Sequence, residues 1–231
     1  SSGFHGVMAV TSGVKSEGMG DGNGKYTIDE GIEHVSPRPW PFPGEDGEAP
    51  EFKYDPHVWT SPKQAKIQVD NIVNTLSQAS PQAKDAFTAA GKKYTDPLED
   101  LDKWASDSMS AVPEQDRVLF SSHDAFGYFS NEYGVKFIGS ALSDFNHQQD
   151  ATSSHIDEQV KKVRESGAKA IFAENSNSSK SIEAIARAAG VKAVTSDDAL
   201  YGDSLGVPGS EGETYIGSIV HNINTLVSAW D

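Results

Sequence analysis

The second half of the chain alternates between short apolar segments and amphipathic helical patterns. Four segments have the length and apolar content of buried strands: RVLFSS at 117–122, VKFIG at 135–139, AKAIFAE at 168–174 and VKAVTS at 191–196. Glycines close the intervening helical stretches at Gly134, Gly167 and Gly190, where a helix often ends in a left-handed residue. This β-α-β-α order predicts an α/β fold, a parallel sheet with helices on both faces.

The first half has a different character. Residues 1–56 hold 10 of the 21 glycines and 6 of the 11 prolines, so we expect mostly loop there, with one strand at GVMAV, 6–10. Ser61 and Pro62 predict the start of a helix whose inner face carries Val69, Ile72, Val73 and Leu76. A second, long helix is expected from Ser80 and Pro81, with a core face and an internal proline, Pro97, that should kink or restart it. The residues expected on this core face are Ala86, Phe87, Ala90, Tyr94, Leu98, Leu101, Ala105 and Met109.

These patterns suggest three regions: a partial N-terminal lobe with a Gly/Pro-rich loop at 1–80, a connecting helix at 81–112, and a C-terminal α/β lobe at 113–231. The final helix should begin near Glu211 and turn six apolar residues to the core, namely Ile216, Ile219, Val220, Ile223, Leu226 and Val227.

Composition excludes several classes of function. The net charge of −15 disfavours binding to nucleic acid or anionic lipid, although surface carboxylates often serve only solubility. The chain has no cysteine, so any metal site must use nitrogen and oxygen ligands. No apolar run approaches the roughly 20 residues of a membrane span. Phosphate loops, GxGxxG and HExxH motifs are also missing from the sequence.

Three side chains that can bind a metal follow predicted strands. His123 follows the first strand, Glu174 follows the third, and Asp203 lies in the loop beyond the fourth. Because the carboxyl ends of parallel strands meet at one edge of a sheet, we expect these side chains to lie together. A fourth candidate, His57, occupies the string DPHVW before the first helix, and we interpret His57 and His123 as halves of one metal site.

Each candidate also has a purely structural interpretation. His57 follows Asp-Pro, a common turn signal, and His123 could cap the helix that starts near Asp124. Asp203 could form only an Asx-turn, and Glu174 could lie beside a metal rather than bind it, since hydrogen-bond donors alone can compensate its burial. The other five histidines show no metal-binding spacing and are expected at the surface: His5, His34, His147, His155 and His221.

Four motifs in order carry a family resemblance: DPHVW before a Ser-Pro-led helix, SSHDAFGYFSNEYG, AIFAENSNSSKSIEAIARAAGV and LYGDSLGVPGSEGETYIGSIVHNINTLV. Together they resemble the metal receptors of bacterial zinc and manganese ABC importers, the cluster A-I solute-binding proteins or zinc-uptake receptor family. The resemblance implies two α/β lobes with parallel sheets flanked by helices, bridged by a long rigid helix. It also implies that the chain is not an enzyme, but captures a metal between its lobes and delivers it to a membrane permease.

Carried over by position, His57 matches the family's second ligand, His123 its third, Asp203 its carboxylate ligand, and Glu174 a carboxylate beside the site. The third position is often histidine in zinc receptors and glutamate in manganese receptors, so His123 favours Zn²⁺, with Mn²⁺ as the alternative. The resemblance implies a periplasmic or cell-surface location, with room for a lipid anchor in a segment outside this chain.

One difference from the family concerns its first ligand. That histidine lies in an upstream DPHxYEP-like string that these 231 residues do not contain, so we expect an incomplete N-terminal lobe. His57, His123 and Asp203 then remain as the protein ligands, with a tetrahedral position left for water, substrate or another group. The family's histidine-rich loop is also replaced by the proline- and acid-rich segment 36–51. Two other functions remain open at this point: a zinc hydrolase with Glu174 as its base, and a surface adhesin with a structural metal.

Overall fold

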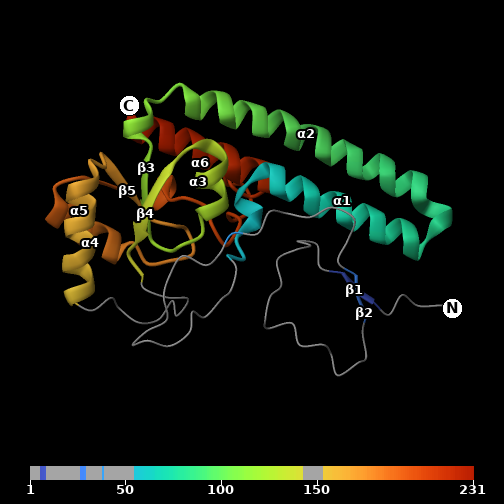
Figure 1. The fold of residues 1–231 in the computed structure, drawn as a ribbon, viewed down its shortest axis with the longest axis horizontal. Coiled ribbons are helices and arrows are strands. Elements are labelled where there is room, and N and C mark those ends of the chain that lie inside the picture. Colours follow the sequence, from blue (N-terminus) through green and yellow to red (C-terminus); the bar gives the residue numbers. More distant parts are fainter. Residues whose placement is uncertain (1–5, 9–26, 30–37, 39–54, 143–152) are drawn as a thin grey trace. The chain divides into compact units, whose positions relative to one another are not determined.

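The computed structural model describes residues 6–8, 27–29, 38, 55–142 and 153–231 (Figure 1). The chain divides into two compact units, Ser1–Asp102 and Lys103–Asp231. Several sequence predictions fall outside the described residues: those for His5, His34 and His147, for the side chain of His155, and for nearly all of the acid-rich segment 36–51.

Within its described residues, the first unit contains a short parallel pair of strands, one complete helix and most of a second. Strand β1 (Gly6–Met8) falls in the predicted segment 6–10 and pairs with β2 (Thr27–Asp29). After a 3₁₀ turn, η3 (Val58–Thr60), helix α1 runs from Pro62 to Ala79. The predicted start is confirmed, since Ser61 is the N-cap, its hydroxyl accepts a bond from the backbone of Gln64, and Pro62 is the first helical residue.

The inner face of α1 differs from the predicted one. Its buried positions include the polar residues Asn71 and Thr75, whereas Ile72 and Leu76 of the predicted apolar stripe are about two-fifths exposed, at 41% and 42%. The spacing of apolar residues predicted the wrong buried face of α1, because a buried helix face can be polar when its polar groups have hydrogen-bond partners. Val73, in contrast, does pack closely, since a Cβ on Gly91 of the next helix would lie 2.4 Å from its Cγ2.

The long second helix forms as predicted. A 3₁₀ turn, η4 (Pro81–Ala83), leads into α2 (Lys84–Ser110), a helix of 27 residues that runs across the boundary between the two units. The predicted restart at Pro97 is wrong, because Pro97 lies inside one continuous helix. The second half of the predicted core face is buried, at Leu98, Leu101, Ala105 and Met109, and the first half is exposed or half-buried.

The second unit is built on a four-stranded parallel sheet in the order β4-β3-β5-β6. After the short turn η5 (Glu114–Asp116), the strands are β3 (Val118–Ser121), β4 (Lys136–Ser140), β5 (Ala170–Phe172) and β6 (Lys192–Val194). Three of them lie inside the segments predicted from the sequence, and β4 extends one residue beyond its predicted segment, to Ser140. The helices between them are α3 (Gly127–Tyr133), α4 (Ser153–Ser166) and α5 (Lys180–Ala189), and β6 leads to the turn η6 (Ser196–Asp198).

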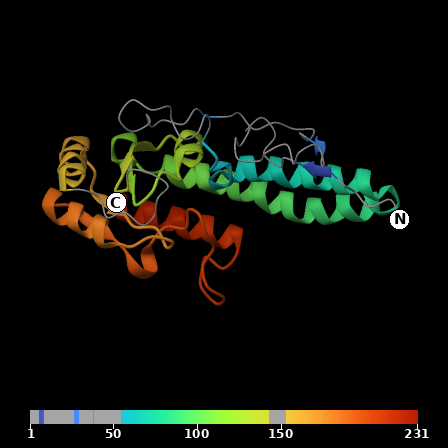
Figure 2. The ribbon, with the colours of Figure 1, turned by 90° about the horizontal axis from the view of Figure 1, so that it is seen from below.

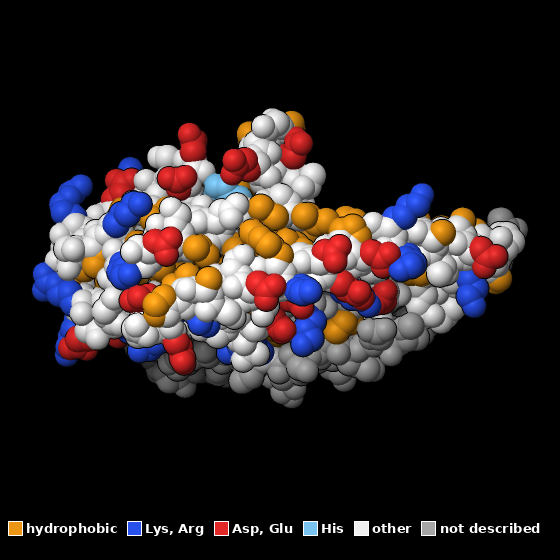
Figure 3. Space-filling model, turned by 90° about the horizontal axis from the view of Figure 1, so that it is seen from above, with side chains coloured by type: hydrophobic (Ala, Val, Ile, Leu, Met, Phe, Trp, Pro, Cys, Tyr) orange, Lys and Arg blue, Asp and Glu red, His pale blue; other side chains and the backbone are white. Residues whose placement is uncertain are grey.

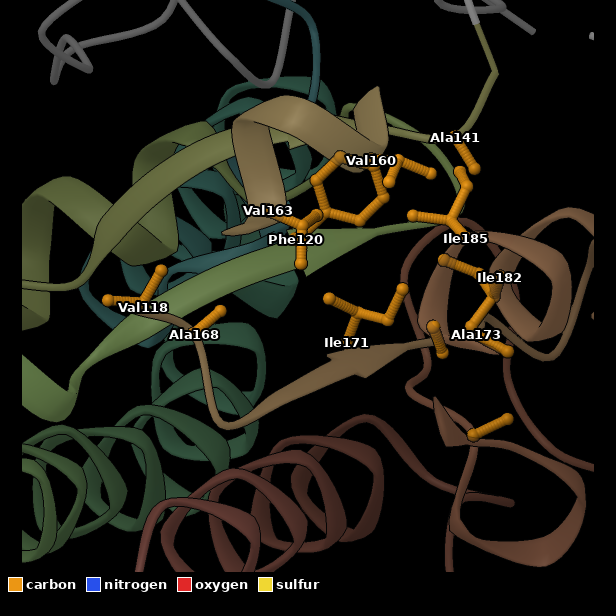
Figure 4. Packing of buried hydrophobic residues seen from close by; sticks show 12 residues of the cluster. Val118, Phe120, Ala141, Val160, Val163, Ala168, Ile171, Ala173, Ile182 and Ile185 are labelled. Carbon is orange, nitrogen blue, oxygen red and sulfur yellow. The ribbon is translucent and has the colours of Figure 1, made fainter. Parts of the chain in front are cut away.

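Alternating side chains divide this core into two layers. Val118, Phe120 and Ile171 point to the face covered by α4 and α5, where they meet Val163 and Ile185 (Figure 4). On the other face Phe172 contacts Trp230 of the last helix, α6 (Tyr215–Trp230), edge to face with ring centroids 6.3 Å apart. The Trp230 indole N–H also donates to the backbone oxygen of Val118. The sheet is therefore covered on both faces, which confirms the predicted α/β class.

Helix α6 begins four residues later than predicted from the pattern. Thr214, rather than a residue near Glu211, is the N-cap, and its hydroxyl accepts a bond from the backbone of Gly217. Residues 205–213 instead fold back on themselves, with Gly206 N–H bonded to the oxygen of Gly212. The segment before α6 is therefore a structured loop.

The surface shows no concentration of one charge on the face drawn in Figure 3, where acidic and basic side chains are interspersed. Within the described residues, no helix has both the length and the apolar character needed to cross a lipid bilayer.

Candidate metal centre

The order of the strands places a ligand-binding edge between β3 and β5. The chain runs from β3 outward to β4 and then returns past β3 to β5, so the direction of winding reverses between these two neighbours. In parallel α/β sheets, ligands bind at the carboxyl ends of the strands at such a reversal. His123 lies two residues after β3 and Glu174 two residues after β5, so both occupy this edge.

His123 and Asp203 come together at this edge as predicted. The imidazole Nε2 of His123 lies 3.2 Å from Oδ2 of Asp203, with His123 buried and Asp203 partly open to solvent at 23% side-chain exposure. His123 is not a helix cap, because α3 begins at Gly127 with Phe126 in the N-cap position. A nitrogen and a carboxylate oxygen that converge in this way are both ligands that Zn²⁺ and Mn²⁺ accept.

Glu174 lies beside this pair and supports it. Its Oε2 accepts a 2.7 Å bond from the backbone N–H of His123, and its own backbone N–H donates to the hydroxyl of Ser122. Burial raises the pKa of Glu174 well above its ordinary value, and the nearby charges of Asp203 and Asp124 raise it further, while the bond from His123 partly offsets them. Within the described residues, Glu174 Oε1 has no hydrogen-bond partner. A cation at this edge would compensate this concentration of buried carboxylates.

Gly202 allows the Asp203 segment to approach Glu174. A Cβ at Gly202 would lie only 2.1 Å from Glu174 Oε1 and 3.2 Å from the Cβ of Ala125. Glycine, which has no Cβ, fits this approach without displacing the buried Glu174 carboxylate.

Replacing Glu174 with glutamine should change the pH dependence of stability in the metal-free chain. Because the pKa of Glu174 is raised on folding, the stability it contributes is complete below its unfolded value, near 4.5, and is lost as pH rises through the folded value. The amide of Glu174→Gln does not ionise, so the variant does not lose stability in this way. The variant should therefore gain stability relative to wild type as pH rises from about 4.5 toward neutrality. Urea unfolding in chelator across this range measures the difference.

The exposed residue Glu165 offers the matched control. Its side chain is 68% exposed and makes only a long 3.9 Å ion pair with Lys161. Glu165→Gln should follow the wild-type pH profile within about 0.5 kcal/mol. Parallel profiles for wild type and Glu174→Gln would show that Glu174 is not held in the buried, charged surroundings described above.

His57 belongs to the first unit and is held by its neighbours in the sequence. The carboxylate of Asp55 accepts bonds from both the backbone N–H and the ring Nδ1 of His57, at 2.9 and 2.7 Å. The turn predicted from Asp-Pro is therefore present, and the same carboxylate orients the imidazole. A proton on Nδ1 leaves the lone pair of the ring on Nε2, the arrangement in which histidine binds a metal.

Three buried polar residues were missed or misjudged from the sequence. Asp55 was read only as part of a turn, although its spacing of two residues from His57 gives a usable signal. His221 is not a surface residue as predicted. It is 7% exposed, and its ring nitrogens lie 3.0 Å from the backbone oxygen of Ala199 and from Glu211 Oε2. Asn222 is fully buried next to it, and no pattern in the sequence marks either residue.

Comparison with known proteins decides the family. Residues 3–229 match the family model described as the zinc-uptake complex component A, periplasmic. The chain belongs to this family. This match confirms the resemblance seen in the four motifs. The family is one of solute-binding receptors, which confirms the prediction that the chain is not an enzyme.

Individual relatives of this chain carry names for both metals. The manganese-binding lipoprotein MntA of Bacillus subtilis is 41% identical over 178 residues, which cover 76% of this chain and 58% of that protein. The zinc-binding protein TroA of Treponema pallidum is 32% identical over 181 residues, covering 78% of this chain and 58% of the relative. The chain thus spans about three fifths of the length of these relatives.

Solved structures agree on the fold. The periplasmic zinc-binding protein TroA from Treponema pallidum superposes with a TM-score of 0.70 at 30% identity, over 79% of this chain and 66% of that one. A manganese-bound periplasmic metal-binding protein from Candidatus Liberibacter asiaticus gives a TM-score of 0.74 at 20% identity, over 90% and 72% of the two chains. The two-lobed α/β architecture predicted from the resemblance is confirmed.

Proposed function

We propose that this chain is the metal-binding part of an extracytoplasmic receptor that captures one divalent transition-metal ion and passes it to the permease of an ABC importer. The convergence of His123 Nε2 and Asp203 Oδ2 beside the buried Glu174 carries this proposal. The imidazole nitrogen and the carboxylate oxygen offer two metal ligands at one point, next to the Glu174 carboxylate. The family of the chain, and the zinc and manganese named for its relatives, support the same proposal.

His57 is the third ligand in this proposal. Its support comes from its own unit, where the Asp55 carboxylate holds Nδ1 and directs the lone pair to Nε2. A carboxylate on the second ring nitrogen is typical of histidines that bind metals, because it fixes the ring and raises its basicity. The position of His57 in the DPHVW motif, where the family resemblance places a ligand, supports the same role.

Zinc is the preferred ion in this proposal, and manganese the alternative. Two imidazoles and one carboxylate leave a tetrahedral position open for water, and imidazole suits zinc better than it suits manganese, which prefers oxygen ligands. Release to a permease requires no chemistry on the ion. Loss of one ligand, such as Asp203, weakens the site enough to let the ion leave.

Calorimetric titration of the metal-stripped chain with Zn²⁺ and Mn²⁺ tests the proposal. We expect saturable one-to-one binding with zinc tighter than manganese, and weaker binding of both in Asp203→Asn. No saturable binding of either ion would overturn the proposed function, and equal or tighter manganese binding would overturn the preference for zinc.

Replacing Asp55 with alanine tests the role of His57 without removing a ligand. The variant loses the bond that fixes the His57 ring, so zinc affinity should fall by about 10- to 100-fold. Asp70→Ala is the matched control, since Asp70 pairs with Lys66 at 2.8 Å on the partly exposed surface of α1. Unchanged zinc affinity in Asp55→Ala would exclude His57 as an oriented ligand.

A further inference from the structure

The loop that carries Asp203 is held by two neighbouring side chains of α6. We define the Asp203 loop as residues 199–213, and it stands out from the second unit just before α6 (Figure 2). We propose that His221 and Asn222 of α6 are positioning residues that fix this loop so that Asp203 faces His123. This inference rests on the proposed function, in which Asp203 is a metal ligand.

Asn222 binds the loop backbone two residues before Asp203. Its Oδ1 accepts a bond from Tyr201 N–H and its Nδ2 donates to Tyr201 O, both at 2.8 Å. This is the pairing that a neighbouring strand would make, supplied here by one side chain. Asn222 is fully buried and Tyr201 is half-buried, so losing these bonds would leave two partly buried backbone groups without partners.

His221 holds the start of the same loop. Its Nε2 donates to the backbone oxygen of Ala199 at 3.0 Å, and its ring meets the Tyr201 ring edge to face with centroids 4.9 Å apart. The Tyr201 ring in turn lies against Gly212, where a Cβ would approach it to 2.3 Å. The pair on α6 therefore contacts the loop both at its beginning and through its folded-back end.

The sheet holds the opposite side of the same segment. Leu200 N–H donates to the oxygen of Ala173, and Asn175 N–H donates to the oxygen of Leu200, so the backbone before Asp203 pairs with the residues on either side of Glu174. The Asn175 side chain also donates to the hydroxyl of Ser204, at 2.9 Å. With the sheet on one side and Asn222 on the other, the chain reaches Asp203 along a fixed path. Such outer contacts change metal affinity although they never touch the ion.

A double-mutant cycle with Asn222→Ala and Asp203→Asn tests the inference by zinc titration. Asn222→Ala should weaken zinc binding by about 10- to 100-fold in the wild-type background. In the Asp203→Asn background the same change should matter by less than about twofold, because the positioned ligand is already lost. If the two fold-changes multiply instead, Asn222 acts on general stability and the inference is wrong.

The control uses the other end of the same helix. Trp230→Phe removes one buried hydrogen bond from α6, to Val118 of β3, without touching the Asp203 loop. It should lower the unfolding temperature and leave zinc affinity within about twofold of wild type. If Asn222→Ala fails to fold, Asn222→Asp carries the same test, since it keeps the bond from Tyr201 N–H and loses the donor to Tyr201 O.

The outcomes separate this inference from the proposed function. Unchanged zinc affinity in Asp203→Asn would show that Asp203 is not a ligand, and the proposed site would fail together with the inference. Weak binding in Asp203→Asn with wild-type affinity in Asn222→Ala would overturn only the positioning role of α6.

Discussion

Replacement of His123 by alanine is expected to weaken zinc binding by more than about 100-fold, which corresponds to about 2.7 kcal/mol. The imidazole is one of two groups that converge at the edge of the sheet between β3 and β5, with Nε2 3.2 Å from Asp203. Its removal takes away the donor that favours zinc and leaves two carboxylates, Asp203 and Glu174, facing each other. Competition with a chromophoric zinc chelator measures the loss.

A second variant in the same segment distinguishes the loss of a metal ligand from the loss of buried side-chain volume. Phe126 lies three residues after His123 in the same segment and is fully buried. Its ring packs edge to face on that of Phe129, with the ring centroids 6.1 Å apart. Phe126→Leu should reduce stability and keep zinc affinity near that of wild type. A fall in affinity of less than about threefold in His123→Ala would contradict the ligand role of the imidazole.

Replacement of Phe120 by alanine is expected to destabilise the second unit by about 3–5 kcal/mol. Phe120 is fully buried on the central strand β3, in the cluster formed with α4 and α5 (Figure 4). The substitution leaves a cavity that close-packed neighbours on three elements cannot fill without moving. Thermal unfolding of the metal-free chain followed by near-ultraviolet circular dichroism checks the loss.

An exposed apolar residue of the same unit provides the comparison. Val207 is 74% exposed at the Asp203 loop, so Val207→Ala should change stability by no more than about 0.5 kcal/mol. Similar losses in the two variants would show that the described packing of β3 is incorrect.

The sequence predicted the architecture of the second unit well because its signals were redundant there. Four apolar segments, three closing glycines and the helical spacing between them all pointed to one parallel sheet, and each strand formed in its predicted segment to within one residue. The carboxyl ends of parallel strands all lie at one edge of the sheet, which is why the sequence alone assigned His123 and Glu174 to that edge.

Predictions failed where burial depends on partners that a pattern does not reveal. The inner face of α1 includes the buried polar residues Asn71 and Thr75 in place of the expected Ile72 and Leu76. His221 was expected at the surface, yet it is buried with a backbone oxygen on one ring nitrogen and a carboxylate on the other. A buried histidine and a surface histidine look identical in a sequence that lacks metal-binding spacing.

Boundaries were the other source of error. The spacing of apolar residues in the last helix extends back toward Glu211, but Thr214 caps it and the residues before it close a loop through Gly206 and Gly212. Pro97 removes one backbone donor from α2 without ending the helix, because the residues on either side continue the turns and bury Leu98 and Leu101.

X-ray absorption at the zinc edge of the loaded chain tests the central claim most directly, because it reports the atoms bound to the ion. The account predicts a first shell of nitrogen and oxygen at about 2.0–2.1 Å, with the multiple-scattering signature of two imidazoles in wild type and of one in His57→Ala and in His123→Ala. A shell of oxygen atoms alone, or an unchanged imidazole signature in both variants, would contradict it.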